Sequence, residues 1–187
     1  MKYVSLARNE YILGDYKIVP LRKVDIQKIR IWRNEQMDVL RQNILISEAA
    51  QINYYVDHII PMFKSQTPKQ ILFSYLHKGI CIGYGGLTNI NWDTQVSELS
   101  FLVETSRSKD EKTYNSDLTA FLDLIISVTF NELHMTRLFT ETYAFRIKHI
   151  TILENSGFVR ENTLSSHVKM GGKYYDSYIH SIIKDKI

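Results

Sequence analysis

One glutamate inside an apolar stretch is the first residue whose position suggests chemistry. In the run SELSFLVETSRSKD, from Ser97 to Asp110, Glu98 lies among side chains that alternate as they do in a strand. A carboxylate in the middle of a central strand costs free energy unless it is paired or used. Glu98 is therefore our first candidate for a general base, and a solvated or salt-bridged glutamate is the alternative.

The loop that follows this strand is a candidate phosphate site. It leads into a strongly apolar helix, and a helix start after a strand often binds phosphate through free N–H groups. We expect Asn115 or Ser116 to cap that helix. The loop contains no glycine, so side chains would have to contact the phosphate in place of closely approaching backbone. Those side chains are Arg107, Ser108 and Lys109, and a mobile charged loop is the alternative.

Length and composition narrow the class of protein. The chain has 187 residues, which predicts a single domain over residues 1–187 with residues 1–14 as a candidate N-terminal extension. The net charge of +3 and the lack of a long basic block disfavour nucleic-acid binding. Cys81 is the only cysteine, so we expect no disulfide framework and no cysteine zinc site. No signal-peptide core and no membrane-length apolar run is found, which predicts a cytoplasmic protein without membrane contact.

Periodicity predicts a mixed α/β architecture, with a mostly antiparallel central sheet of about seven strands flanked by about four helices. The stretch VSELSFLV, the apolar helix after it and the stretch TRLFTETY form a β-α-β crossover, so these two strands should be parallel. The expected elements are a strand at Asp15–Leu21, helices at Val24–Gln42 and from Ser47 to Pro61, a hairpin at Lys69–Ile90 turned at Lys78-Gly79, a strand at Val96–Val103, a helix from Leu118 to about Leu133, a strand at Thr136–Tyr143, a helix at Phe145–Phe158, and strands at Val159–Met170 and Lys173–Lys184.

Four stretches in this order resemble the GCN5-related N-acetyltransferases, the GNAT family. They are IRIWRNEQ with ISEAA, IGYGGLTNINWDTQVSELSFLV, TETYAFRIKHITILENSGFVRE and GGKYYDSYIHSII, and together they cover nearly the whole chain from Asp15 onward. The first looks like the branch that acts on nucleotide-linked amino sugars, and like the related ribosomal-protein N-terminal acetyltransferases. The resemblance implies the GNAT fold and acetyl-CoA as cosubstrate.

The same resemblance implies roles for individual residues. Glu141 would lie on the strand beside that of Glu98 and is the rival candidate for the base. Backbone groups of one strand would bind the pantetheine arm, namely those of Phe101, Leu102 and Val103. Arg146 stands where the family often has a cofactor-binding asparagine. Three residues of the first helix would contact the acceptor: Trp32, Arg33 and Asn34.

The chain departs from the family pattern at several positions. The glycines of the family's cofactor loop are missing, Leu153 replaces a tyrosine often used as general acid, and Gln51 replaces a histidine common in the sugar-modifying members. The sequence does not choose a replacement acid among its tyrosines, of which the candidates are Tyr143, Tyr174 and Tyr175. His149 and His180 are expected to be structural or exposed, because no metal-ligand spacing surrounds them, and we expect no metal.

These features together predict an acetyl-CoA-dependent N-acetyltransferase that works by direct transfer, because no cysteine lies on the expected pocket strand. The expected acceptor is the primary amine of a small molecule, with a nucleotide-linked amino sugar as first choice. A protein N-terminus is the second enzymatic choice, and a non-catalytic relative that binds acyl-CoA weakly is the alternative of another class. A homodimer stays an open expectation, because the residues do not decide the oligomeric state.

Overall fold

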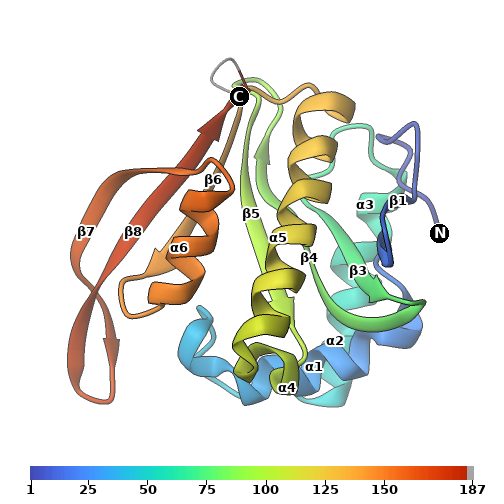
Figure 1. Ribbon diagram of the computed structural model, residues 1–187. Helices are drawn as coiled ribbons and strands as arrows, with labels where there is room; N and C mark the ends of the chain where they lie inside the picture. Colours follow the sequence, from blue (N-terminus) through green and yellow to red (C-terminus); the bar gives the residue numbers. More distant parts are fainter. Residues whose placement is uncertain (185–187) are drawn as a thin grey trace.

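An eight-stranded sheet organises the computed structural model, which describes residues 1–184 (Figure 1). The strands lie in the order β1-β2-β3-β4-β5-β6-β8-β7, and neighbours are antiparallel except β5 and β6. This confirms the parallel pair that the β-α-β crossover predicted. The strands are β1 (Tyr11–Leu13), β2 (Tyr16–Pro20), β3 (Ile71–His77), β4 (Ile80–Asn91), β5 (Val96–Val103), β6 (Arg137–Tyr143), β7 (Val159–Met170) and β8 (Lys173–Ile183).

The sheet has one strand more than predicted. The additional strand is β1, which lies in residues 1–14, the candidate N-terminal extension. Upstream of it, Tyr3 is buried, and its hydroxyl bonds both the carbonyl and the amide of Leu72 at 2.9 Å. The N-terminal residues therefore pack into the same body as the rest of the sheet. The predicted β3–β4 hairpin is confirmed, with Lys78 and Gly79 both at positive φ, as a tight two-residue turn requires.

Helices cover both faces of the sheet (Figure 1). One face carries α1 (Ile26–Glu35), α2 (Glu48–Tyr54) and α3 (Ile60–Lys64), and the other carries α5 (Glu111–Ser127) and α6 (Ile147–Asn155), with the short α4 (Thr105–Lys109) leading into α5. Within residues 1–184 no helix is both long and apolar enough to cross a membrane.

Several predicted helix boundaries were wrong, two of them in the helices that cover the first face of the sheet. The first helix ends at Glu35 instead of Gln42, because the side chain of Gln36 turns inward to the carbonyl of Val103 at 2.9 Å. Pro61 does not end the second helix. A π-helical turn precedes it, and Pro61 lies in the first turn of α3, where the missing N–H is not needed.

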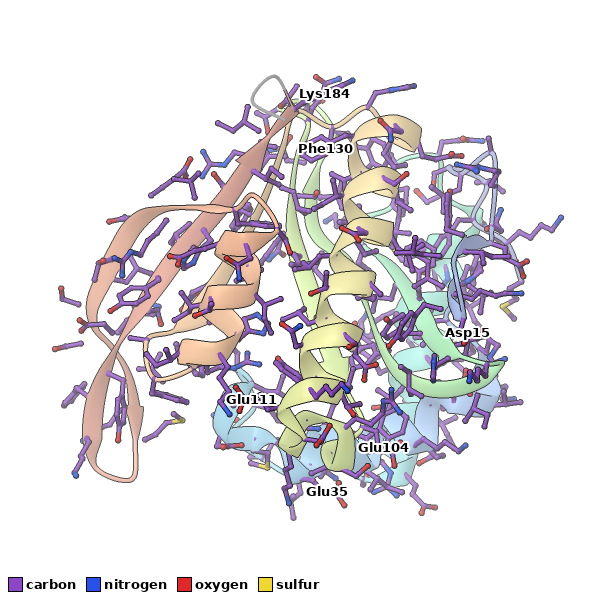
Figure 2. The ribbon with its side chains drawn as sticks, viewed as in Figure 1. Asp15, Glu35, Glu104, Glu111, Phe130 and Lys184 are labelled. Atoms are coloured by element: carbon purple, nitrogen blue, oxygen red, sulfur yellow. The ribbon has the colours of Figure 1, made fainter. Side chains whose placement is uncertain are left out.

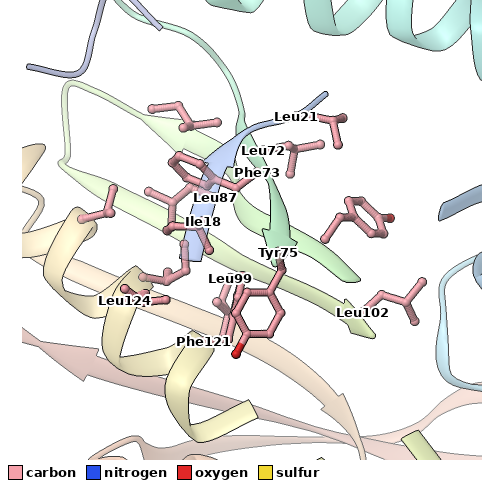
Figure 3. Packing of buried hydrophobic residues seen from close by; sticks show 14 of the residues in the cluster. Ile18, Leu21, Leu72, Phe73, Tyr75, Leu87, Leu99, Leu102, Phe121 and Leu124 are labelled. Atoms are coloured by element: carbon pink, nitrogen blue, oxygen red, sulfur yellow. The ribbon is translucent and has the colours of Figure 1, made fainter. Parts of the chain in front are cut away.

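The hydrophobic core lies on both faces of the sheet, and Figure 3 shows part of it, including Phe121 and Leu124 of α5. The fully buried ring of Phe121 lies 4.7 Å from that of Phe101 and 5.1 Å from that of Tyr75, measured between centroids. Gly85 of β4 allows this approach, since a Cβ there would lie 2.7 Å from Phe121 Cζ and 2.2 Å from the Ser100 carbonyl oxygen. The packing fixes the tilt of β5 under α5 and so the position of its polar residues.

Candidate active site

The two parallel strands at the centre of the sheet separate halfway along their length. β5 and β6 pair from Val96 opposite Arg137 to Glu98 opposite Phe139, and no pairing follows. On its other side β5 still pairs with β4 as far as Val103. The edge of β5 after Glu98 therefore faces an opening in place of a neighbouring strand, and apart from the Val103 carbonyl, which accepts from Gln36, its peptide groups on that side are available to a ligand.

A cavity of about 230 Å³ lies at this opening, with two glutamates in its wall. We call it the carboxylate cavity. It is lined by Glu98 from β5 and Glu141 from β6, together with Arg41 from the segment after α1. Both carboxylates are largely buried, with side-chain exposures of 9% for Glu98 and 11% for Glu141. The structure thus brings together the two residues proposed as alternative bases.

One arginine nitrogen bridges these carboxylates. Nη2 of Arg41 lies 2.7 Å from Oε1 of Glu98 and 2.8 Å from Oε2 of Glu141. The Arg41 side chain is 55% exposed, so it reaches in from solvent. The guanidinium is thus the exposed partner of two largely buried carboxylates, and a cation that enters from solvent would compete with it for them.

The remaining oxygen of Glu98 is held by Asn89, whose Nδ2 donates to Oε2 at 2.6 Å. Asn89 lies in an irregularity of the β4–β5 ladder between Thr88 and Asn91, and it has φ of +47°. Asparagine tolerates this left-handed conformation better than most residues, and such bulges re-aim side chains. His167 of β7 approaches the outer oxygen of Glu141 at 3.6 Å.

A second cavity of about 490 Å³ runs along the open edge of β5. We call it the strand-edge cavity. It is lined by the strand residues predicted to bind pantetheine, namely Phe101, Leu102 and Val103, and by Ser108 and Lys109. It shares Phe101, Arg146 and His149 with the carboxylate cavity, so the two are adjacent. Gln36 covers the end of the edge by its bond to the Val103 carbonyl.

A buried histidine marks the place where the cavities meet. Nδ1 of His149 lies 2.7 Å from the hydroxyl of Tyr114, and Nη2 of Arg146 donates to that same hydroxyl oxygen at 3.0 Å. Because the tyrosine oxygen accepts from Arg146, we infer that the Tyr114 hydroxyl donates its hydrogen to Nδ1 of His149. Nδ1 is then the acceptor, and the imidazole carries its own hydrogen on Nε2. Burial first, and then the nearby charge of Arg146, hold the pKa of His149 well below its usual value. The imidazole is therefore neutral near pH 7.

The loop predicted to bind phosphate is largely helical. Its helix α5 begins at Glu111, earlier than predicted, and Asp110 caps it by accepting from the Thr113 amide at 2.8 Å. Asn115 and Ser116 are therefore not caps. They lie in the second turn and line a different surface cavity, beside β1 and β2.

Arg107, a predicted phosphate ligand, is instead paired with a carboxylate of the protein. Its guanidinium forms a two-pronged ion pair with Asp117, at 2.6 and 2.7 Å, and that carboxylate is fully buried. A buried carboxylate needs such a partner, so the arginine is committed. Figure 2 shows Glu35, Glu104 and Glu111 at this same end of the molecule, where α5 begins. Of these three acids only Glu35 lines the strand-edge cavity, where Asp38 is joined by the cations Lys109, Arg146 and Lys148.

Of the three residues proposed for acceptor contact, only one lies at a cavity. Arg33 lines the carboxylate cavity and donates to the Tyr84 hydroxyl. Trp32 is instead part of the hydrophobic core and lines none of the cavities described here. Asn34 holds the segment after α1 in place, since its side chain bonds both the amide and the carbonyl of Ile46 at 2.9 Å. Neither is placed for acceptor contact.

Sequence patterns missed the residues that hold the glutamates. Arg41 lies in the part of the predicted helix that is not helical, and its contacts are 57 and 100 positions away in the chain. Asn89 and Gln36 likewise act through contacts that only the folded chain creates. The one available signal was Asn89 itself, an asparagine near the end of the predicted hairpin, since asparagine is disfavoured in strands.

Comparison with known proteins agrees with this geometry. Residues 18–179 match the model of a family described as Acetyltransferase (GNAT) domain. The crystal structure of spermidine N-acetyltransferase from Vibrio cholerae in complex with CoA and spermine is similar, with a TM-score of 0.79 and 18% identity over 93% of this chain and 98% of that one. A dodecameric structure of the same Vibrio cholerae enzyme in an intermediate state gives a TM-score of 0.75 at 17% identity, covering 93% and 96% of the two chains. No curated protein matches the sequence.

Proposed function

We propose, from the premise that the chain belongs to the GNAT acetyltransferase family, that it transfers an acetyl group from acetyl-CoA to the primary amine of a small molecule. One observation carries this proposal. Two buried carboxylates face each other beside the open edge of β5 and hold a single cationic nitrogen between them. An amine that enters as an ammonium ion fits that position, because it can replace Arg41 charge for charge.

Glu98 is the proposed general base. An acceptor ammonium must lose a proton before its nitrogen can attack, and Glu98 takes that proton directly or through water. Acetyl-CoA supplies the thioester, whose C–S bond breaks as the new C–N bond forms, and the departing sulfur takes up a proton. Glu141 holds the ammonium beside Glu98 and is the alternative base. Direct transfer needs no acyl-enzyme, and the buried Cys81 lines neither cavity.

His149 is the proposed hydrogen-bond donor where the two cavities meet. Among residues 1–184 its Nε2 has no hydrogen-bond partner, whereas its Nδ1 is held by Tyr114. A neutral imidazole with its hydrogen on Nε2 donates to an oxygen without carrying charge of its own. Such a donor stabilises the oxyanion that develops on the thioester carbonyl.

The strand-edge cavity is the proposed site of coenzyme A. Peptide groups of Phe101 to Val103 would bind the amides of the pantetheine arm, because no strand pairs with that edge of β5. Lys109 and Lys148 line the same cavity and are the proposed phosphate contacts, together with Arg146 and Ser108. Side chains thus take the part that glycine-rich backbone would otherwise play.

One observation favours a second candidate, a relative of the enzyme that binds acyl-CoA weakly and does not turn it over. The start of α5 is occupied by its own cap, Asp110, and Lys148 is paired with Glu111. Negative groups at a helix start oppose the binding of a pyrophosphate. Cofactor titration distinguishes this candidate from the enzyme.

The test combines calorimetric titration with acetyl-CoA and assay of thiol release in the presence of amines. We expect micromolar binding, and in Glu98→Gln a loss of about 10²- to 10⁴-fold in kcat with unchanged cofactor affinity. Glu141→Gln is the matched variant and should mainly raise the KM of the amine. Failure to bind at millimolar acetyl-CoA would favour the non-catalytic relative, and full turnover in Glu98→Gln would exclude Glu98 as the base.

A further inference from the structure

A third cavity, of about 300 Å³, lies between helices α1 and α2 and the sheet. We call it the glutamine cavity, after Gln51 in its wall. It shares Arg33, Thr88 and Ser100 with the carboxylate cavity, so the two are neighbours on the same face of the sheet. A molecule held at the carboxylates can therefore extend into it.

Gln51 presents an unsatisfied amide to this cavity. Its residue is only 6% exposed, and within residues 1–184 the side-chain amide has no hydrogen-bond partner. Ser47 caps α2 by accepting from the Ala50 amide, and this places Gln51 on the inward face of the first turn, in line with the buried Tyr55. The amide atoms of Gln51 are not among the enclosed unpaired polar atoms, so they open onto the cavity, where a polar group of a ligand can pair with them.

The charge of the glutamine cavity restricts what that group can be. Among residues 1–184 no carboxylate lines it, and the one charged residue in its wall is the cation Arg33. Arg33 is already engaged, by the hydroxyl of Tyr84 and by Oε1 of Gln42 at 3.0 Å. The rest of the wall is uncharged and consists of aliphatic side chains, two tyrosines, two glutamines, a threonine and a serine. A second ammonium would find no counter-ion there and would be repelled by the guanidinium.

We propose that the glutamine cavity binds the body of the acceptor through an uncharged amide or imide group, which pairs with both the donor and the acceptor of Gln51. The proposal rests on the proposed function, since the amine of the same molecule lies between Glu98 and Glu141. It predicts an acceptor with one cationic end and one neutral end. A linear polyamine, which is charged at both ends, is the poorer substrate.

The test compares diamines with their mono-N-acetyl derivatives, which keep one primary amine and exchange the other for an amide. Putrescine and cadaverine provide two lengths. With acetyl-CoA saturating, we expect kcat/KM to favour each mono-acetyl compound by about tenfold, as a gained hydrogen bond and a lost charge repulsion predict. Gln51→Met, which keeps the volume and removes the amide, should abolish the preference. Gln66→Met, at an exposed position after α3, should retain it.

A second readout does not depend on turnover. The side-chain NH₂ resonances of Gln51, assigned by their absence in Gln51→Met, should shift on addition of mono-N-acetylcadaverine and stay unchanged with cadaverine. Turnover of both compounds without preference would overturn the inference and leave the proposed function intact. Absence of thiol release with every amine, with the Gln51 resonances still shifting, would overturn the proposed function alone. Unshifted resonances with the mono-acetyl compound would overturn the inference.

Discussion

Single residues decide the chemistry of this site, and Arg41 shows how. Its guanidinium occupies the place between Glu98 and Glu141 where a substrate ammonium would lie, at distances of 2.7 and 2.8 Å. The bridge explains why two carboxylates can lie so close together in a largely buried wall, since each is compensated. It also makes Arg41 an intramolecular competitor of the acceptor.

Replacement of Arg41 by alanine should therefore favour the acceptor. We expect Arg41→Ala to lower the KM of a cationic amine by at least about fivefold with kcat retained, because even an exposed ion pair is worth about 1 kcal/mol and these carboxylates are largely buried. Steady-state kinetics measure both constants. Arg30→Ala, which removes an ion pair to Glu48 away from both cavities, is the control. A drop in kcat without a change in KM would mean that Arg41 positions Glu98 instead.

At the scale of the elements, we expect the start of α5 to influence the affinity for the cofactor. The glycine-free loop folds into α4 and the cap Asp110, so the free N–H groups of the helix start are partly used. Hydrogen bonds from Thr113 also hold the pKa of Asp110 below its ordinary value, so the cap is charged near neutral pH. The helix is stabilised where a phosphate would otherwise bind.

Removal of this cap should tighten cofactor binding. Asp110→Gly frees the Thr113 amide and deletes a negative charge, whereas glycine at a cap position costs only a few tenths of a kcal/mol of helix stability. We expect the Kd of coenzyme A to fall by about two- to fivefold in calorimetric titration at low salt. Asp93→Gly is the control, because it removes one negative charge from the exposed turn between β4 and β5, away from the start of α5. Equal affinities of the two variants would contradict the role of Asp110.

On the scale of the whole molecule, two buried histidines couple folding to pH. Burial is the first cause that lowers the pKa of both His149 and His180, and the charge of Arg146 adds to it at His149. In the unfolded chain these groups titrate near pH 6.5. Below that pH the unfolded chain binds protons that the folded protein does not, so stability is complete above about pH 6.5 and is lost as the pH falls.

The free energy of unfolding should accordingly decrease in mild acid. By pH 5 we expect a loss of up to about 2 kcal/mol for a fully buried histidine, from 1.36 kcal/mol per pH unit below the unfolded pKa. Urea melts at pH 7 and pH 5 measure it. His149→Gln keeps an acceptor for Tyr114 but has no group that titrates in this range. The free energy of unfolding of this variant should therefore decrease less between pH 7 and pH 5. An identical pH dependence of variant and parent would show that His149 does not contribute.

The order and type of most elements followed from the sequence alone. Alternating and helical periodicities, the Lys78-Gly79 turn and the positive-φ Gly157 after α6 act between residues close in the chain, and these are the interactions that patterns report. The parallel pairing of β5 and β6 followed as well, because a strand–helix–strand link admits one handedness. Glu98, in the middle of an apolar strand, was identifiable for the same local reason.

The partners of that glutamate were decided only by the tertiary structure. Arg41, Asn89 and Glu141 meet Glu98 because β5 and β6 diverge and a loop from the opposite face of the sheet reaches into the gap. Arg107 could not be excluded as a phosphate ligand until Asp117 was seen buried beneath it. Side-chain pairing across the fold depends on distances that no spacing along the chain encodes, and burial then fixes which charges must be satisfied.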